Sequence, residues 1–385
     1  MKKLITANHA AGLAATLAGR ANRKGRGFGG GVYPITPQTE SIEFLSRQEI
    51  EKGSVVRVES EHSAMAVCIG MASNGARTFT ASSSNGLAYM TENVITAAMY
   101  RLPIVMLAVN RTLGPPWNIW VDHNDTLLLR DSGWIQLYCE DNQEAFDSLL
   151  FAYRLSEDPR VLLPTMVCID AFVLSHTLME TDIPEQDQVD GFLPPLQMQH
   201  RISDKPRTMG GLDFPHETEV HRGQMQDAMN RVFKVYEEHQ KAFEKSFGRS
   251  IDGPVVPYRT EDAEVVIVSM GTLGATAKQA VDTARERGIK AGSLRVKMFR
   301  PFPEQQLVDA LKGAKKIAVI DRDLSPGMGG ILWSELRGAV RTADVVQSYL
   351  IGLGGGDVRP HHLVEIFDDL AERDRPEPSI LKEVA

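Results

Sequence analysis

The stretch ESEHSAMAVCIGMASNGARTFTASSSNGLAYM, residues 59–90, decides the fold class of this chain. Its first half carries small and apolar residues at helical spacing over 62–72, and a short apolar strand pattern follows over 77–83. A second helical pattern begins at once and covers 87–100. A helix, a buried strand and another helix in close succession indicate a parallel sheet with helices on both faces.

The same rhythm continues on both sides of this stretch. We predict further strands at 30–36, 54–60, 103–110, 135–140 and 165–172, and further helices at 10–19, 40–52 and 143–156. A second series has predicted strands at 264–270, 292–298, 315–321 and 345–352, and predicted helices at 275–287, 304–312, 330–340 and 360–372. Short strands that alternate with helices in both series predict two α/β units.

The segment between the two series lacks periodicity. Residues 181–220 are rich in Pro, Asp, Gln and Gly, which predicts a linker or a subunit-wrapping segment, and a polar helix is expected over 223–247. We therefore expect three parts: an α/β unit over 1–180, a linker with its helix over 181–253, and a second α/β unit over 254–385.

The composition excludes several classes of function. The 385 residues are 43% hydrophobic and 24% charged, as in ordinary globular domains, and the net charge of -8 argues against nucleic acid or an anionic membrane as a partner. No apolar run reaches the roughly 18 residues that a membrane span needs. Cys68, Cys139 and Cys168 lie far apart in apolar stretches, which predicts buried thiols in a reducing cytoplasm and no disulfide, zinc or iron–sulfur framework.

The first residues faintly resemble a signal peptide, because a basic start precedes a partly apolar run. Asn8 and His9 interrupt that run, so we expect an amphipathic first helix instead. The basic, glycine-rich residues 20–30 follow, and a partner interface is one interpretation of them.

Glycine patterns occur at three places and are weak signals. GRGFGGG (25–31) precedes a predicted strand, whereas the dinucleotide-binding motif follows one, so the pattern does not indicate a nucleotide site. SPGMGG (325–330) and GLGGGD (352–357) do follow predicted strands, and they predict tight turns.

Three side chains with useful chemistry follow predicted strands. Ligands of open parallel sheets bind at the carboxyl ends of the strands. Thr36 lies in the turn YPITP, Glu61 begins a helix after the next strand, and Arg111 follows the strand 103–110. A buried carboxyl would have a raised pKa, and an arginine can hold a carboxylate with two hydrogen bonds. Plainer alternatives stay open: a helix cap for Thr36, a dipole-favoured carboxylate for Glu61 and a surface side chain for Arg111.

Two loops belong to the same candidate edge. The serine-rich turn 82–86 has small residues that let a ligand approach the backbone, although a solvated loop is the alternative. The loop 114–125 has two tryptophans and can close over a substrate or pack on a neighbour. Asp122, His123 and Asp125 have metal-ligand chemistry but lack a clear fourth ligand, so we predict no metal site.

Four segments, in order, resemble the alpha subunit of pyruvate:ferredoxin oxidoreductase and its 2-oxoacid relatives. They are YPITPQTE (33–40), ESEHSAMAVCIGMASNGARTFTASSSNGLAYM (59–90), NRTLGPPWNIWVDHNDTLLLRDSGWIQLYCEDNQEAFD (110–147) and VIDRDLSPGMGGILWSEL (319–336). The resemblance covers nearly the whole chain. It implies an α/β fold with a pyrimidine-type thiamine-diphosphate-binding domain over 1–180 and a transketolase C-terminal-like domain over 254–385.

The resemblance also implies roles for the three candidates. Glu61 takes the place of the glutamate that contacts the aminopyrimidine ring of thiamine diphosphate and so promotes deprotonation of the thiazolium C2. Thr36 and Arg111 take the places that hold the 2-oxoacid, with Thr36 also beside the cofactor. The implied reaction is oxidative decarboxylation to an acyl-coenzyme A and CO₂, with electrons passed to ferredoxin.

The implied substrate is pyruvate, because a single strong arginine suits a monoanionic 2-oxoacid. An aromatic or branched-chain 2-oxoacid stays open as an alternative. A non-catalytic assembly subunit and a non-redox, transketolase-like enzyme are the other two alternatives.

The motifs that are missing imply partners. The Gly-Asp-Gly segment that holds Mg²⁺ in such enzymes is absent, since Gly356 and Asp357 precede Val358, and clustered cysteines are absent too. The resemblance thus implies that Mg²⁺, the diphosphate site and [4Fe–4S] clusters belong to beta and delta subunits, with a gamma subunit completing the complex. It further implies a dimer of hetero-oligomers, active only as a complex, in cytoplasmic anaerobic metabolism.

Overall fold

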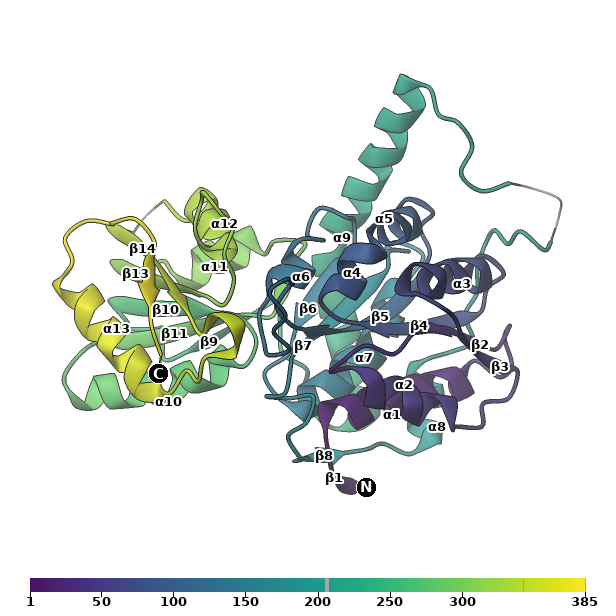
Figure 1. Cartoon of the computed structure of the whole chain (residues 1–385), viewed down its shortest axis with the longest axis horizontal. Coiled ribbons are helices and arrows are strands. Elements are labelled where there is room, and N and C mark those ends of the chain that lie inside the picture. The colour runs from purple at the N-terminus through teal and green to yellow at the C-terminus, as the bar shows by residue number, and fades with distance from the viewer. Residues whose placement is uncertain (205–207, 342, 385) are drawn as a thin grey trace.

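The computed structural model describes residues 1–204, 208–341 and 343–384, and in these residues two large sheets and one short ribbon are formed (Figure 1). The strands of the first sheet are β2 (Phe28–Val32), β3 (Gly53–Arg57), β4 (Arg77–Ser82), β5 (Ile104–Asn110), β6 (Ile135–Tyr138), β7 (Thr165–Asp170) and β12 (Met298–Arg300). Their order is β12-β6-β7-β5-β4-β2-β3. Strand β12 runs antiparallel to β6, and the other neighbours are parallel.

The second sheet is also mainly parallel. Its strands are β9 (Val255–Tyr258), β10 (Val265–Ser269), β11 (Ala291–Val296), β13 (Lys316–Asp321), β14 (Val345–Ile351) and β15 (Ile380–Lys382). They lie in the order β15-β14-β13-β10-β11-β9, with β9 antiparallel to β11. The predicted α/β class with parallel sheets is therefore confirmed.

Helices cover both faces of each sheet (Figure 1). On the first sheet, one face carries α1 (Ala7–Ala21), α2 (Thr39–Ser46), α7 (Asn142–Ser156) and α8 (Gln186–Phe192), and the other carries α3 (Glu61–Ser73), α4 (Asn85–Tyr89) and α5 (Thr91–Met99). On the second sheet, α10 (Leu273–Glu286) and α13 (Pro360–Glu372) lie opposite α11 (Glu304–Ala310) and α12 (Ile331–Ala339). The short helix α6 (Asn124–Leu127) lies between β5 and β6 in the chain.

The glycines of residues 25–31 form a strand instead of a turn. A Cβ at Gly31 would lie 2.0 Å from the carbonyl oxygen of Ala64, and one at Gly29 would lie 2.2 Å from the sulfur of Met71. The missing side chains thus let α3 pack directly on β2. The strand ends at Val32, before the prolines of the next turn, so the predicted range 30–36 was placed too late.

The first helix is buried on nearly all sides, so the prediction of an amphipathic helix was wrong. Its small residues allow the close packing of α1 against α2 and α7: a Cβ at Gly12 would lie 2.8 Å from the carbonyl oxygen of Ser41. Lys2–Ile5 form β1, which pairs antiparallel with β8 (Met179–Asp182). In the following segment 20–30, the basic residues Lys24 and Arg26 are exposed.

The segment between the two sheets has more structure than a linker. It holds the end of β8, then α8, and then the long helix α9, which begins at Pro215 rather than Gly223 and ends at Phe247. Proline suits the first turn of a helix, where its missing N–H costs nothing. The boundaries predicted at 180 and 253 stay a prediction.

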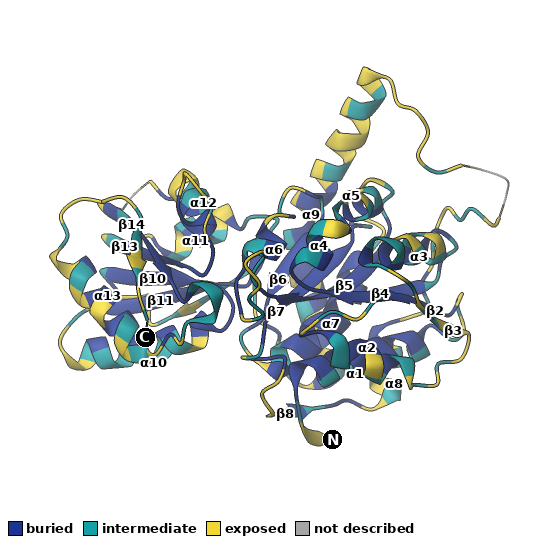
Figure 2. Ribbon diagram, viewed as in Figure 1, coloured by how far each residue is buried: buried dark blue, intermediate teal, exposed yellow. Residues whose placement is uncertain are grey.

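Helix α9 is supported over its C-terminal part alone. Val232, Tyr236 and Phe243 are buried in the first core. Residues 212–226, which we name the arm, project from the body and are largely exposed (Figures 1 and 2). Leu212 and Phe214 at its tip are 92% and 64% exposed, which is unusual for large apolar side chains.

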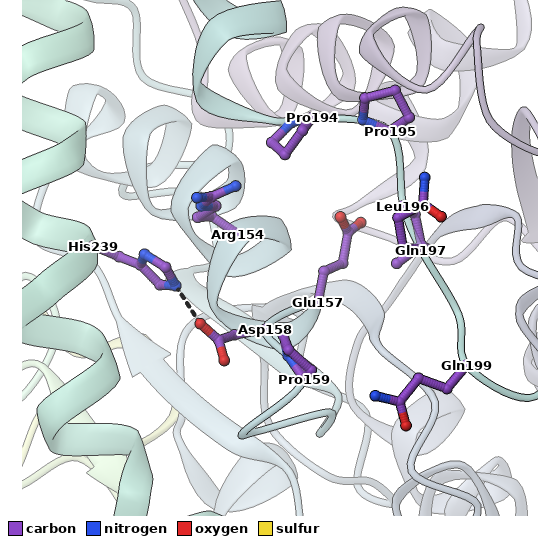
Figure 3. Close-up of a pocket in the computed structure, with 10 residues that line it drawn as sticks. All are labelled: Arg154, Glu157, Asp158, Pro159, Pro194, Pro195, Leu196, Gln197, Gln199 and His239. Atoms are coloured by element: carbon purple, nitrogen blue, oxygen red, sulfur yellow. Dashed lines mark hydrogen bonds and ion pairs between the residues drawn. The ribbon is translucent and has the colours of Figure 1, made fainter.

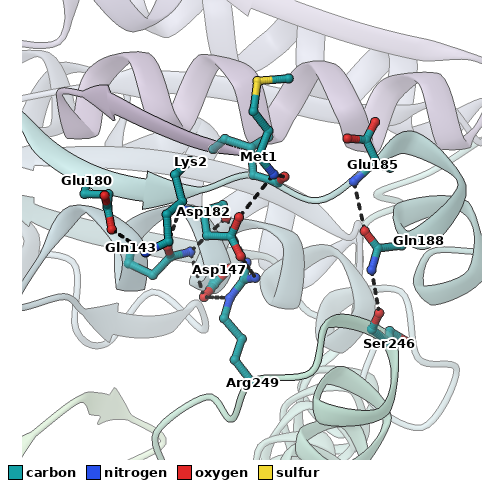
Figure 4. A network of polar contacts seen from close by, with 11 residues as sticks. Met1, Lys2, Gln143, Asp147, Glu180, Asp182, Glu185, Gln188, Ser246 and Arg249 are labelled. Atoms are coloured by element: carbon teal, nitrogen blue, oxygen red, sulfur yellow. Dashed lines mark hydrogen bonds and ion pairs between the residues drawn. The ribbon is translucent and has the colours of Figure 1, made fainter.

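Ionic contacts tie the ribbon to α7 and to the end of α9 (Figure 4). Arg249 binds Asp147 of α7 at 2.6 Å and Asp182 of β8 at 3.5 Å. The N-terminal amino group donates to the carbonyl oxygen of Ile183 at 2.7 Å. These contacts fix the start of the chain against the helices.

A buried charged network joins the carboxyl ends of β7 and β13. Asp170 accepts from His123 at 2.8 Å, lies 3.3 Å from Arg322, and accepts from the backbone N–H of Thr272 at 3.2 Å. Burial raises the pKa of Asp170, while His123 and Arg322 lower it, to about 2. The two sheets therefore meet through a fixed carboxylate near the ligand-binding edge.

Candidate active site

The three predicted site residues follow three strands of the first sheet, and the serine-rich turn follows the strand between two of them. In the order β5-β4-β2-β3, Arg111 follows β5, the serine-rich turn 82–86 follows β4, Thr36 follows β2 and Glu61 follows β3. All lie at the carboxyl edge, where ligands of parallel sheets bind.

Glu61 is a buried carboxyl at the start of α3. Ser60 caps the helix, its hydroxyl accepting from the backbone N–H of Ser63 at 3.3 Å, and this fixes the first turn. Glu61 is 7% exposed and forms no ion pair with any described residue. Burial raises the pKa of Glu61, and its own backbone N–H opposes this. The carboxyl is therefore shifted toward its neutral form.

A glycine leaves room for this carboxyl. A Cβ at Gly86, in α4, would lie 2.6 Å from Oε1 of Glu61 and 2.5 Å from Oγ of Ser82. Ser82 is completely buried, and its hydroxyl finds no hydrogen-bond partner among the described residues. An unpaired carboxyl, an unpartnered hydroxyl and a missing side chain meet here, which fits a site for a ring with polar nitrogens.

Thr36 and Arg111 are in direct contact. Nη1 of Arg111 donates to the carbonyl oxygen of Thr36 at 2.6 Å, and Nε donates to the carbonyl oxygen of Asn118 at 3.2 Å. Arg111 is 6% exposed, and no carboxylate of the described chain forms an ion pair with it. Burial lowers the pKa of Arg111, and Asp125 opposes this. A buried guanidinium that forms no ion pair with the described residues is suited to bind an anion.

Asp125 holds the main chain on both sides of the site. Its Oδ2 accepts from the backbone N–H groups of Ser84 at 2.8 Å and of Arg111 at 3.0 Å. Its Oδ1 accepts from Nδ2 of Asn110 and from the N–H of Thr126, both at 2.8 Å. Burial raises the pKa of Asp125 to about 6 against these donors. The sequence identified Asp125 as a residue with metal-ligand chemistry. It gave no signal that Asp125 accepts hydrogen bonds from these main-chain N–H groups.

The tryptophan loop is attached to the second sheet. Nδ2 of Asn118 donates to the carbonyl oxygen of Gly354 at 2.9 Å, and a Cβ at Gly355 would lie 2.2 Å from Cβ of Trp120. Trp117 and Trp120 themselves are 69% and 51% exposed. The glycine turn 352–357 thus supports the loop that follows Arg111, a contact that the sequence did not indicate.

The other metal-ligand candidates are held by protein groups. His123 pairs with Asp170, and Asp122 accepts from the backbone N–H of Asn124 at 2.9 Å. In the described ranges no three His, Cys, Asp or Glu side chains are grouped so as to hold a metal ion. Cys68, Cys139 and Cys168 are free and buried, as predicted.

A cavity of 330 Å³ lies away from these residues (Figure 3). His239 and Asp158, which line it, form a hydrogen bond of 3.0 Å, and Glu157, also in the lining, binds Arg77, the first residue of β4, at 2.6 Å. The cavity therefore lies near the amino end of β4, away from Glu61, and its lining includes the charged side chain of Arg154. No helix of the described residues is long and apolar enough to cross a membrane.

Two family models match the chain. Residues 30–241 match the thiamine-diphosphate-binding domain of pyruvate flavodoxin/ferredoxin oxidoreductase, and residues 263–363 match core domain II of pyruvate:ferredoxin oxidoreductase. The first match alone covers more than half of the chain.

Curated relatives are similar over almost the full length. Pyruvate synthase subunit PorA of Methanothermobacter thermautotrophicus is 42% identical over 382 residues, with 98% of this chain and 97% of that protein covered. Ketoisovalerate oxidoreductase subunit VorA of Pyrococcus horikoshii is 41% identical, with 96% and 94% covered.

A solved structure shows the same fold. The 2-oxoglutarate:ferredoxin oxidoreductase of Magnetococcus marinus superposes with a TM-score of 0.76 at 19% identity. The match covers 96% of this chain and 65% of that longer chain.

Proposed function

The chain belongs to the pyruvate:ferredoxin oxidoreductase family, as a subunit of a multi-subunit 2-oxoacid oxidoreductase, and from this premise we propose how its own residues act. Glu61 is the group that contacts the aminopyrimidine ring of thiamine diphosphate. The observation that carries this assignment is a buried carboxyl without an ion pair, beside Gly86 and an unpartnered Ser82 hydroxyl.

When bound, the cofactor supplies the carbon nucleophile and the electron sink for decarboxylation. Glu61 would share a proton with a ring nitrogen, and its raised pKa supports this role because burial makes the carboxyl take up a proton more readily. Because Gly86 has no Cβ, the carboxyl of Glu61 has room for its position beside α4. Exclusion of water by the surrounding side chains would strengthen the hydrogen bond.

Arg111 and the turn at Thr36 would hold the 2-oxoacid. Arg111 offers a buried cation without an ion pair to any described residue, and Thr36 is exposed at the same edge. One cation matches the single carboxylate of pyruvate, which we propose as the substrate. A branched-chain 2-oxoacid is the second candidate, because a ketoisovalerate oxidoreductase subunit is as similar to this chain as a pyruvate synthase subunit is.

Another subunit would supply the rest of the cofactor site. We infer that Mg²⁺, the diphosphate pocket and [4Fe–4S] clusters are held by beta, gamma and delta subunits, which pass electrons to ferredoxin, and that coenzyme A accepts the acyl group. The three free, buried thiols fit a cytoplasmic complex.

A face beside Glu61 is suited to receive the diphosphate-binding subunit. Helix α3 has no Asp, Glu, Lys or Arg after its first residue. Its exposed positions are occupied by the small residues Ala66 and Gly70. On the neighbouring helices, Tyr89, Ile95 and Met99 are 61%, 45% and 36% exposed. Exposed apolar side chains on adjacent helices are typical of a stable interface.

The arm supports the expected pairing of two such assemblies. Gly223 lies within the exposed part of α9, and a Cβ there would meet no atom within 4 Å, so nothing in the single chain explains a residue that costs a helix about 1 kcal/mol. Close approach by a second copy of the arm would explain it. Gly223→Leu should then halve the mass of the purified complex in light scattering, and an unchanged mass would contradict this pairing.

The proposed function is tested by the visible spectrum of the purified complex during anaerobic addition of 2-oxoacids. Bleaching of iron–sulfur absorption by pyruvate and coenzyme A is the expected result, with weaker bleaching by 2-oxoisovalerate. A colourless complex, or a spectrum that no 2-oxoacid changes, would overturn the proposal. Wild-type turnover in Glu61→Ala would overturn the role of Glu61 alone.

A further inference from the structure

We propose that Asp125 is a positioning residue that fixes Arg111 relative to the serine turn beside Glu61. The inference rests on the proposed function, because it concerns the geometry of the same site. Asp125 lies in α6 and is completely buried, and it is 14 positions from Arg111 in the chain.

A single oxygen of Asp125 joins the two halves of the site. Oδ2 accepts from the backbone N–H of Arg111 and from that of Ser84, at 3.0 and 2.8 Å. Arg111 follows β5 and reaches toward Thr36, whereas Ser84 follows β4 and precedes Gly86, where a Cβ would lie 2.6 Å from Oε1 of Glu61. One oxygen of Asp125 therefore contributes to the distance between the substrate cation and the cofactor carboxyl, beside the contacts that Ser84 and Asn85 make with the segment after β5.

The backbone at Ser84 needs such a partner. Its φ of 52° lies in the left-handed region, with ψ at −128°, a conformation that L-residues rarely adopt. The hydroxyl of Ser84 donates to the carbonyl oxygen of Thr112, and its N–H donates to Asp125. Both contacts join the turn after β4 to the segment after β5, and thus hold Ser84 in its strained conformation.

Oδ1 of Asp125 is anchored separately. It accepts from Nδ2 of Asn110 and from the N–H of Thr126, and the same Nδ2 donates to the Thr126 hydroxyl at 2.6 Å. The carboxylate cannot rotate without losing donors on both sides. An asparagine at this position would place its NH₂ group against one of the two pairs of N–H donors. The hydrogen bonds to that pair would be lost, while the volume of the side chain stays nearly the same.

We expect the loss of these hydrogen bonds to weaken substrate binding while the complex still assembles. In the purified complex, we expect Asp125→Asn to raise KM for pyruvate about tenfold or more, with thiamine diphosphate affinity within about twofold of wild type. Asp321→Asn is the matched control. Asp321 is equally buried and also accepts main-chain N–H groups, from Leu332 and Trp333, but it caps α12 on the second sheet.

A double-mutant cycle separates positioning from general support of the fold. If Asp125 acts through Arg111, Asp125→Asn should raise KM much less when Arg111 is already Lys, because the aligned guanidinium is gone. An equal increase of KM in both backgrounds would overturn the proposal, as would an unchanged KM in the single variant. The failure of the wild-type complex to turn over any 2-oxoacid would instead overturn the proposed function.

Should Asp125→Asn not assemble, Asn110→Ala tests the same point. It removes one donor from Oδ1 and leaves the carboxylate intact. We expect the same change of KM, with smaller size, and again little effect in the Arg111→Lys background. A KM equal to that of wild type would overturn the proposal.

Discussion

Gly86→Ala introduces one methyl group between the two polar groups of the proposed cofactor site. The added Cβ would lie 2.6 Å from Oε1 of Glu61 and 2.5 Å from Oγ of Ser82, whereas ordinary contact begins at 3.4 Å. The carboxyl must then move by the difference, about 0.8 Å, if the helix stays in place. A displacement near 1 Å at a reacting group costs on the order of 10²-fold in rate.

The substitution should leave the chain folded. Alanine is favoured over glycine in a helix by about 1 kcal/mol, and Gly86 has an ordinary helical backbone within α4. We therefore expect kcat to fall about 10²-fold, which corresponds to about 2.7 kcal/mol of activation free energy, while the complex assembles normally.

The assay is pyruvate-dependent reduction of an electron acceptor by the purified complex, with cofactor binding followed by near-ultraviolet circular dichroism. Gly191→Ala is the matched control, because a Cβ there would meet nothing within 4 Å and α8 covers the opposite face of the sheet. A kcat for Gly86→Ala within about threefold of wild type, in an intact and cofactor-loaded complex, would refute the proposed packing of Glu61.

Three further predictions follow from the ionic contacts. Arg111→Lys should raise KM for the 2-oxoacid about tenfold to hundredfold in steady-state kinetics, since lysine lacks the planar pair of donors, and an unchanged KM would contradict the anion site. Glu144 of α7 forms ion pairs with the buried cations Arg295 and Lys297, at 2.9 and 3.0 Å. Burial raises the pKa of Glu144 and these two cations lower it, to about 2, so its contribution of about 3 kcal/mol is present above pH 4.5 and is lost as the pH falls toward 2. Glu144→Gln should flatten the fall of the unfolding midpoint over that range, and parallel curves would argue against this pairing. Arg322→Leu leaves the carboxylate of Asp170 less compensated and should destabilise the chain by about 3–5 kcal/mol in thermal unfolding, whereas an unchanged midpoint would show that the contact carries little free energy.

The order of the main elements could be predicted because the apolar periodicity is strong. The strands 77–83, 103–110 and 165–172 match β4, β5 and β7 to within two residues, since buried parallel strands are continuous apolar runs. The edge strands β1, β8, β9 and β15 were missed, because they are short and half-exposed. Burial of α1 on all sides was missed because alanine and glycine give no clear apolar face.

The site could be predicted to the level of strand ends and no further. The rule on carboxyl ends identified the positions of Thr36, Glu61 and Arg111, and the contact between Arg111 and Thr36 agrees with it. The bonds of Asp125 and the space at Gly86 depend on segments that are far apart in the chain and meet only in the folded sheet. No local pattern encodes such contacts.

The central claim, that Glu61 of this chain acts on a cofactor completed by another subunit, is tested most directly by hydrogen–deuterium exchange at C2 of thiamine diphosphate bound to the purified complex. In Glu61→Gln we predict exchange slower by about 10² to 10⁴-fold, measured by NMR after rapid acid quench, with the same cofactor occupancy as wild type. Exchange at the wild-type rate in the fully occupied variant would contradict the claim.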